Sequence, residues 1–343
     1  MAAPQIDLIS DTSTRPSPEM REFMCRAKVG DEQLREDPSV NQLQDMVAKL
    51  TGKQAALFLP SGTMCNEIAV RVHCEPGDEV IGDKTFHVWN YEVGGAAALS
   101  GALVYPVDGR CGMFSAEQLA KAIRPHSNHM PRSRMIVVEQ TSNMGGGSVW
   151  PLEEIMAVCE TAREHDLACH MDGARLMNAV VASGISAQEF SAPFDSVWID
   201  LSKGLGCPVG AVLAGSNEFI EKAWRWKHQF GGAMRQAGII AAAGIFALQH
   251  NVERIAEDHA AAQQLAAGLA NTLGIEVEPV ETNIVFFDVS KTNLDARQFT
   301  AHLAKLGVRV GPCGPTRVRA VTHLDVTMQD IDSALTAIQN LIS

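Results

Sequence analysis

One lysine stands where the sequence predicts buried structure. Lys203 separates VWIDL from PVGAVLAG, two segments apolar enough to form adjacent buried strands. Burial favours the neutral form of an amine, and a neutral amine can attack an aldehyde to form a Schiff base. The position therefore indicates covalent attachment of pyridoxal phosphate, although a lysine at a strand end could also extend its amine into solvent.

An aspartate ends the preceding predicted strand, roughly thirty residues earlier. In ACHMDGARLMNA a short apolar run ends at Asp172, and Gly173 then allows the backbone to turn closely. This carboxylate could pair with the pyridinium nitrogen of the cofactor and keep the ring an electron sink, or it could cap a helix. An aspartate and a lysine that each close a strand, about one βα unit apart, favour the cofactor interpretation.

Strands and helices alternate through the first 240 residues or so, which predicts a mainly parallel sheet with helices on both faces. Cofactor ligands are then expected at the carboxyl ends of the strands. The pattern changes near residue 245, where helices and strands indicate a smaller α+β unit. We expect an N-terminal arm and large domain over residues 1–245, and a small C-terminal domain over 246–343.

The composition argues against several other classes of protein. The 343 residues carry a formal net charge of -12 without a basic cluster, so nucleic acid is not expected as a partner. No secretory signal opens the chain and no apolar run reaches membrane-spanning length, which predicts a cytoplasmic protein with no membrane partner. The eight cysteines are scattered, and CxxC and HExxH motifs are absent, so no metal site is expected. GLGCPVG misses the GxGxxG spacing, which removes the main support for a nicotinamide cofactor.

A candidate phosphate site follows the apolar segment AALFLP. Ser61, Gly62 and Thr63 lie where a buried strand turns into a helix, and the first turn of a helix presents free N–H groups to an anion. Ser-Gly-Thr is a weak motif in isolation, and only its position after a strand supports the interpretation.

Several motifs resemble one enzyme family. MDGARLMNA, LSKGLGCPVG and GGAMRQAG resemble the L-threonine aldolase branch of the β-eliminating lyases, pyridoxal-phosphate enzymes of fold type I. The likeness extends from DLISDTSTRPSPEMR to VTHLDVT, which is nearly the whole chain. It implies a large domain with a seven-stranded sheet, cleavage of β-hydroxy-α-amino acids to glycine and an aldehyde, and a homodimer or homotetramer with active sites shared between subunits.

The alternatives are other classes of protein on the same fold. A β-eliminating lyase would release pyruvate and an aminotransferase would exchange amino groups, and both would retain Lys203 and Asp172. A non-enzymatic module with a decayed pocket is a third alternative, which turnover of any β-hydroxy amino acid would exclude.

The resemblance also implies roles for individual residues. Lys203 would carry the cofactor, Asp172 would bind its ring nitrogen, and His87 would stack on the ring. The other residues implied at the cofactor are Ser61, Gly62, Thr63, Ser202 and Arg235, of which Arg235 would reach the phosphate of the adjacent subunit. His228 stands seven positions before Arg235, where the family usually has a basic residue that assists this contact. Ser10, Arg175 and Arg319 would bind the substrate carboxylate, and Trp89, with Tyr91 and Glu92 in the same loop, would shape the substrate pocket.

The chain departs from its family at one position near the substrate. The family usually shows Glu-Asn-Thr-His-Asn, whereas residues 139–143 read EQTSN, so Ser142 replaces a histidine. A serine can accept a hydrogen bond from the substrate hydroxyl but cannot act as a base near neutral pH in the way that imidazole does. Water, Ser142 and the cofactor phosphate are then candidates for the base. If Trp89 and Trp150 line the vacated space, aromatic β-substituents are favoured; otherwise selectivity stays broad.

Overall fold

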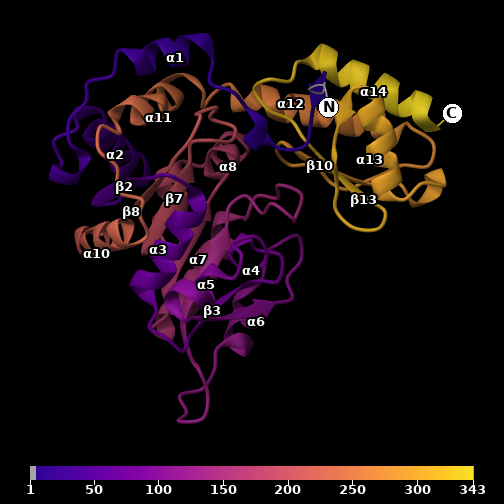
Figure 1. The fold of residues 1–343 in the computed structure, drawn as a ribbon. Helices are drawn as coiled ribbons and strands as arrows, with labels where there is room; N and C mark the ends of the chain where they lie inside the picture. Colours follow the sequence, from indigo (N-terminus) through magenta and orange to yellow (C-terminus); the bar gives the residue numbers. More distant parts are fainter. Residues whose placement is uncertain (1–4, 343) are drawn as a thin grey trace.

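The computed structural model describes residues 5–342, which form two lobes (Figure 1). The larger lobe contains the central sheet, and the smaller lobe contains the C-terminal helices and strands. Within residues 5–342, no helix combines the length and the apolar character needed to cross a membrane.

The large domain is built on a seven-stranded sheet with the order β2-β8-β7-β6-β5-β3-β4. Strand β8 runs antiparallel to both neighbours, and every other adjacent pair in this sheet is parallel. The predicted mainly parallel sheet is therefore confirmed. The strands are β2 (Ala55–Leu59), β3 (Asp78–Asp83), β4 (Leu103–Val107), β5 (Arg132–Glu139), β6 (Ala168–Gly173), β7 (Ser196–Asp200) and β8 (Ala211–Gly215).

Helices cover both faces of this sheet because its strands are apolar on both sides. In β5, for example, Ile136 and Val138 enter the core on one face, and Met135 and Val137 enter the core on the other. The first face is covered by α2 (Pro38–Thr51), α6 (Ala116–Ala122), α7 (Leu152–Glu164), α8 (Leu176–Ser183), α9 (Ala187–Ser191) and α11 (Gly238–His250), with α1 (Pro18–Cys25) packed on α11. The second face is covered by α3 (Gly62–His73), α4 (His87–Asn90), α5 (Gly95–Ser100) and α10 (Asn217–Gln229).

Local sequence signals fix the ends of several helices. The Ser17 side chain caps α1, and Asp37 caps α2 directly before a proline at its first position. Gly52 ends α2 with a φ of 66°, a conformation that favours glycine.

The small domain is a four-stranded antiparallel sheet of order β12-β13-β10-β9 with helices packed against it. Its elements are α12 (Ile255–Ala270), β9 (Glu276–Val277), β10 (Ile284–Asp288), α13 (Ala296–Lys305), β11 (Val308–Arg309), β12 (Gly311–Pro312), β13 (Arg317–Val321) and α14 (Met328–Ile342). The N-terminal arm joins this domain through β1 (Ile6–Asp7), which pairs with β11. Three short 3-10 turns, at Asp11–Ser13, Glu32–Leu34 and Ser290–Thr292, complete the structure.

The expected domain boundary between residues 245 and 246 falls inside α11. Ile245 and Ala247 both belong to the core of the large domain, so the helix stays with that domain on either side of the boundary. We propose that the division follows α11, at the turn before α12.

Candidate active site

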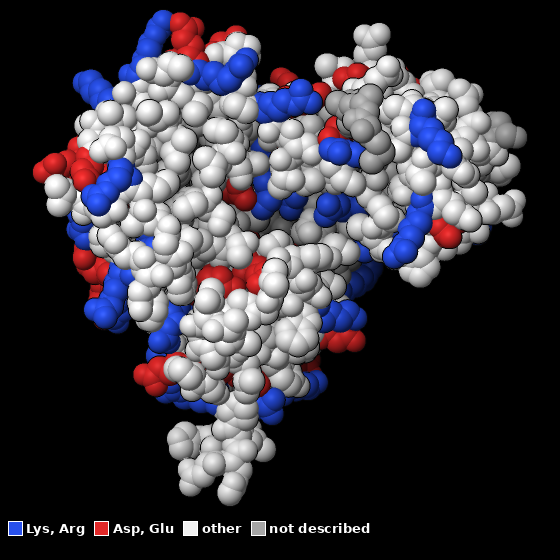
Figure 2. Space-filling model, in the orientation of Figure 1, with Lys and Arg blue, Asp and Glu red and all other residues white. Residues whose placement is uncertain are grey.

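A cavity of about 460 Å³ lies at the junction of the large domain, the small domain and the N-terminal arm. Figure 2 shows the surface hollowed between the two lobes, with basic side chains gathered there. The lining comes from His87, Tyr91, Glu139, Asn143, Met144, Asp172, Ala174, Arg175 and Lys203 in the large domain, Pro312, Cys313 and Arg319 in the small domain, and Ser10 and Thr12 in the arm.

The parallel register brings the chemical groups of the large domain together. Glu139 of β5 pairs with Asp172 of β6, and Asp172 pairs with Trp198 of β7, so two carboxylates are neighbours at the carboxyl ends of the strands. Lys203 follows β7 by three residues and lines the same cavity. The sequence placed Asp172 and Lys203 at strand ends, and the sheet register explains why they meet.

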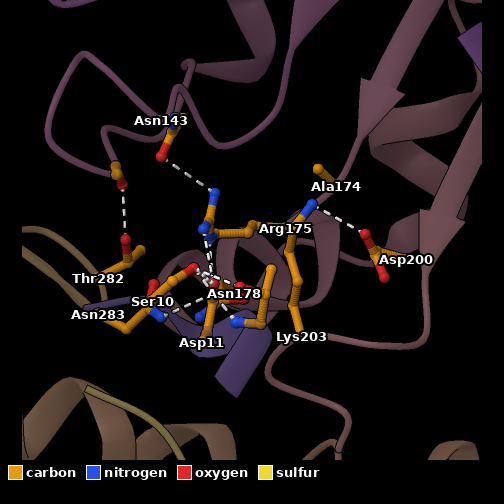
Figure 3. A network of polar contacts seen from close by, with 12 residues as sticks. Ser10, Asp11, Asn143, Ala174, Arg175, Asn178, Asp200, Lys203, Thr282 and Asn283 are labelled. Atoms are coloured by element: carbon orange, nitrogen blue, oxygen red, sulfur yellow. Dashed lines mark hydrogen bonds and ion pairs between the residues drawn. The ribbon is translucent and has the colours of Figure 1, made fainter. Parts of the chain in front are cut away.

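Lys203 is held by a carboxylate that the sequence reasoning did not identify. Its Nζ lies 2.8 Å from Oδ2 of Asp200, and the ammonium stands 5.6 Å from the Trp198 ring centroid. The backbone N–H and the hydroxyl of Ser202 both donate to Oδ1 of Asp200, which fixes this carboxylate (Figure 3 shows Asp200 beside Lys203). The amine is therefore oriented within the cavity by its own turn.

Asp172 makes a local turn contact and also faces the cavity. Its Oδ1 accepts a hydrogen bond from the Ala174 N–H at 3.0 Å, which closes a turn at the end of β6. Its Oδ2 accepts from Nδ2 of Asn66 at 2.9 Å. Oδ1 of Asn66 accepts from the indole N–H of Trp198 at 2.7 Å, which fixes the direction of the amide. Arg175, not Asp172, is the N-cap of α8, so the interpretation of Asp172 as a helix cap is wrong. Asn66 is a partner that the sequence did not single out.

His87 is held against three acidic side chains. Its Nδ1 lies 2.8 Å from Oε1 of Glu92, and its backbone N–H donates to Glu139 at 2.7 Å. One side-chain nitrogen or oxygen atom from each of His87, Glu92 and Asp172 lies within 4.8 Å of the corresponding atoms of the other two. Burial lowers the pKa of His87, but the hydrogen bond to Glu92 and the charge of Asp172 raise it to a net value above the ordinary one.

Glu139 links two segments of the cavity wall. Its two oxygens accept from the N–H groups of His87 at 2.7 Å and Asn143 at 2.6 Å. Burial and the charge of Asp172 raise the pKa of Glu139 to about 7, against the opposing effect of those two donors. The sequence signal for this residue was the same as for Asp172, a carboxylate at the end of an apolar strand.

Two arginines point into the substrate side of the cavity (Figure 3 shows Arg175). The Nε and Nη2 atoms of Arg175 each donate to Asp11 at 2.7 Å, and this pair is buried. Arg319 donates to Oδ1 of Asn143 at 2.9 Å, while its buried Nε has no partner among residues 5–342. Ser10 lines the same cavity, so the three predicted carboxylate ligands are brought together. The sequence reasoning missed Asp11, whose only signal was its place in SDT.

The structure does not bring the predicted aromatic pocket together at Ser142. Ser142 is buried and lies outside the cavity lining. Its Oγ packs against Gly112, where an added Cβ would lie only 1.8 Å from that oxygen. Trp89 is exposed and lines a separate surface cavity, and Trp150 is fully buried in the core with its ring edge-on to Phe114. The expectation that Trp89 and Trp150 line a space vacated at Ser142 is therefore wrong. Tyr91 and Met144 line the cavity instead.

The predicted phosphate site lies beside the lysine turn. Ser61 caps α3 through its hydroxyl, and the following amides have no partner within the helix. A Cβ at Gly62 would lie 2.2 Å from the Trp198 indole, the same ring that faces Lys203. Position 62 therefore requires glycine for the α3 terminus to approach the lysine turn. The hydroxyl of Ser202 points to Asp200 in this arrangement.

Arg235 and His228 lie outside the cavity lining. Arg235 is exposed and pairs with Asp31 at 2.9 Å, and His228 is exposed with its ring edge-on to Trp224. The adjacent Lys227 is fully buried and pairs with Glu32. Within one chain, neither Arg235 nor His228 contributes to the described cavity.

The residues present suit pyridoxal phosphate. Lys203 supplies an amine, Asp172 a buried carboxylate and His87 a flat ring beside that carboxylate. The α3 terminus, which Gly62 allows to pack against Trp198, offers an anion site outside the described lining. The unpaired Nε of Arg319 offers a donor for a further anionic group, such as a substrate carboxylate.

Comparison with known proteins supports the same assignment. The solved structure of Leishmania major threonine aldolase superposes with a TM-score of 0.87, covering 98% of this chain and 100% of that one at 19% identity. The chain therefore shares the fold of this threonine aldolase structure.

Sequence comparison identifies the family. The profile of the β-eliminating lyases matches residues 7–292. The low-specificity L-threonine aldolase of Escherichia coli K12 is 43% identical over 327 residues, covering 95% of this chain and 96% of that protein. Low-specificity L-threonine aldolase 1 of Arabidopsis thaliana is 40% identical, with 99% and 97% covered. The chain belongs to the β-eliminating lyase family, in its L-threonine aldolase branch.

Proposed function

We propose that the protein cleaves β-hydroxy-α-amino acids to glycine and an aldehyde, with pyridoxal phosphate as cofactor. Substrates of the type of L-threonine, L-allo-threonine and L-phenylserine fit this activity. The observation that carries the proposal is one cavity in which Lys203 and Asp172 face two arginines, Arg175 and Arg319. The relatives with 40% and 43% identity over nearly the whole chain are low-specificity L-threonine aldolases, which supports this reaction over elimination or amino transfer.

The cofactor, when bound, supplies an electron sink that stabilises the carbanion left by cleavage of the Cα–Cβ bond. Lys203 is proposed to hold it covalently, and Asp172 to keep a proton on its ring nitrogen. His87, fixed by Glu92 and Glu139, would support the ring face. Ser61, Gly62, Thr63 and Ser202 would bind its phosphate group.

The arginines would hold the carboxylate of the substrate and thereby fix the orientation of the bond to be cleaved. The Nε and Nη2 atoms of Arg175 already donate to Asp11. Its remaining nitrogen, Nη1, lies 3.4 Å from Oδ1 of Asn143. Arg319 contributes the buried Nε that lacks a partner. We therefore propose Arg319 as the principal carboxylate ligand and Arg175 as its companion, with Ser10 beside them.

We also propose a homodimer or homotetramer with shared active sites. Ser61 and Thr63, at the phosphate site, are exposed in one chain, and the Arg235 side chain is 64% exposed and outside its own cavity. A second subunit that delivered Arg235, and His228 near it, would close this open side and add positive charge for the phosphate. Sedimentation of the wild type and an Arg235→Ala variant, with cofactor affinity measured on both, tests this assembly.

We place the enzyme in the cytoplasm. All eight cysteines are free thiols, and five of them are buried, which suits a reducing compartment. Fractionation of the native host with detection of the protein tests the location.

The reaction is tested by product analysis. Purified protein with pyridoxal phosphate is given L-threonine, L-allo-threonine and L-phenylserine, and glycine, acetaldehyde, benzaldehyde and pyruvate are quantified. Equal amounts of glycine and the matching aldehyde are expected, with none from Lys203→Ala. Release of pyruvate, or exchange of amino groups with a keto acid, would instead assign one of the alternative activities.

A further inference from the structure

Three carboxylate oxygens behind His87 are buried without a partner among residues 5–342. They are both oxygens of Glu67, on α3, and Oε2 of Glu92, in the segment between α4 and α5. Each of these side chains belongs to a residue that is only 4% exposed. Two ionised carboxylates in such a place would be strongly unfavourable, because neither has a donor for these oxygens.

One shared proton resolves this arrangement. Burial, and then the charge and hydrogen bond of Glu92, raise the pKa of Glu67 to about 8, so Glu67 is neutral at neutral pH. A protonated Glu67 can donate a hydrogen bond to Glu92, which gives one oxygen of Glu67 and one oxygen of Glu92 a partner. Gly95 packs closely against Oε1 of Glu67, since an added Cβ at Gly95 would lie 1.9 Å from that oxygen. No separate donor fits between Gly95 and this oxygen.

Glu92 connects this proton to the cavity. Its Oε1 lies 2.8 Å from Nδ1 of His87 and accepts from Nδ2 of Asn66 at 2.7 Å. The same amide nitrogen of Asn66 donates to Asp172 at 2.9 Å. One carboxylate oxygen therefore sets both the ring of His87 and the amide that holds Asp172.

We propose that Glu67 and Glu92 form a proton-sharing pair that positions His87 and, through Asn66, Asp172. Among residues 5–342 neither carboxylate oxygen of Glu67 bonds to His87 or Asp172, so Glu67 would act through Glu92 and is a positioning residue. The inference deepens the proposed function, because it rests on His87 and Asp172 as the groups that hold the cofactor ring.

The pair makes the cofactor site sensitive to alkaline pH. When Glu67 loses its proton, two buried negative charges repel each other, and Glu92 is driven from His87 and Asn66. The other titratable groups around the pair are His87, Asp172, Glu139, whose pKa is raised to about 7, Cys65, whose pKa is raised, and His170, whose pKa is lowered to about 3. All of these groups are present in both the wild type and a Glu67 variant. A difference between the pH profiles of the two proteins therefore arises from the carboxyl group of Glu67.

The first test uses the full-length apoprotein. Glu67→Gln keeps a neutral donor of the same shape and cannot ionise. A carboxyl whose folded-state pKa is raised costs the wild type stability progressively from about pH 4.5 to about pH 8. The melting temperature of Glu67→Gln minus that of wild type should therefore increase by about 5 °C or more between those pH values. Glu75→Gln, at an exposed carboxylate, is the matched control and should show no such trend. A difference that does not change with pH overturns the proposal.

The second test measures the affinity of the apoprotein for pyridoxal phosphate across the same range. Relative to Glu67→Gln, the wild type should lose up to about tenfold in affinity between pH 7 and pH 9. Glu67→Leu removes the donor and should bind weakly at every pH; if it does not fold, the Gln variant alone decides. Identical pH profiles for wild type and Glu67→Gln would refute the pair even if glycine is released. The melting shift without glycine release would refute the proposed reaction and leave the pair intact.

Discussion

Replacement of Asp11 by asparagine should weaken both the fold and the binding of substrate. Asp11 is fully buried and accepts two hydrogen bonds of 2.7 Å from Arg175, which is itself only 5% exposed. Removing one partner of a buried pair leaves an uncompensated charge and costs about 3–5 kcal/mol. Because asparagine retains one acceptor, we expect about 3 kcal/mol, or a melting temperature lower by about 5–10 °C. The loosened Arg175 should raise KM about tenfold.

The pH dependence of the same variant gives a second check. Burial opposes ionisation of Asp11, but the charge and hydrogen bonds of Arg175 outweigh it and hold the pKa of Asp11 well below its usual range. Stability from such a group is present above about pH 4 and is lost as the pH falls toward the lowered folded-state value. The wild type should therefore exceed Asp11→Asn in melting temperature at pH 7, with a gap that closes in acid.

The control for this prediction is Asp325→Asn. Asp325 pairs with Arg15 at 4.0 Å, and the Arg15 side chain is 81% exposed. Such a pair contributes at most about 1 kcal/mol. If Asp11→Asn changes melting temperature and KM no more than Asp325→Asn does, the assigned role of the Asp11–Arg175 pair is refuted.

Four further substitutions test individual assignments. Lys203→Ala should abolish turnover and covalent cofactor attachment with an unchanged circular dichroism spectrum; near wild-type glycine release would end the assignment. Asp172→Asn should retain some cofactor binding but slow cleavage by about 100-fold or more, measured as kcat, because an amide does not hold the pyridinium proton by charge. If aromatic side chains lined the space at Ser142, kcat/KM for L-phenylserine would exceed that for L-threonine, and Ser142→His would move the ratio back toward L-threonine. The buried position of Ser142 predicts instead that this variant lowers melting temperature and leaves the ratio unchanged, whereas Tyr91→Ala, at a cavity residue, shifts it.

The residues that could be predicted share a local signal. Asp172 lies at the end of β6 and Lys203 follows β7, and the apolar run of each strand is visible in the sequence. Parallel strands place such ends at one edge of a sheet. Gly62 was predicted for its place in a strand-to-helix turn, and the Trp198 ring now explains why no side chain fits there. The central sheet was predictable for the same reason, since its strands are apolar on both faces.

The residues that escaped prediction act through distant partners. Asp11 reaches Arg175 across 164 positions of sequence, and Asn66 reaches Asp172 across 106. Neither spacing leaves a periodic pattern. Ser142 was instead predicted at the cavity but does not lie there. Its place in a family motif suggested a position at the cavity, whereas its side chain packs against Gly112.

The central claim is that Lys203 is the residue that holds the cofactor in this cavity. Borohydride reduction of the protein loaded with pyridoxal phosphate, followed by digestion and mass spectrometry, identifies the modified lysine. The chain offers an internal competitor, Lys227, a fully buried amine whose pKa burial lowers to about 7. Our account predicts a stable phosphopyridoxyl group on Lys203, lost in Lys203→Ala. Modification of Lys227 or another lysine, with Lys203 unmodified, would contradict it.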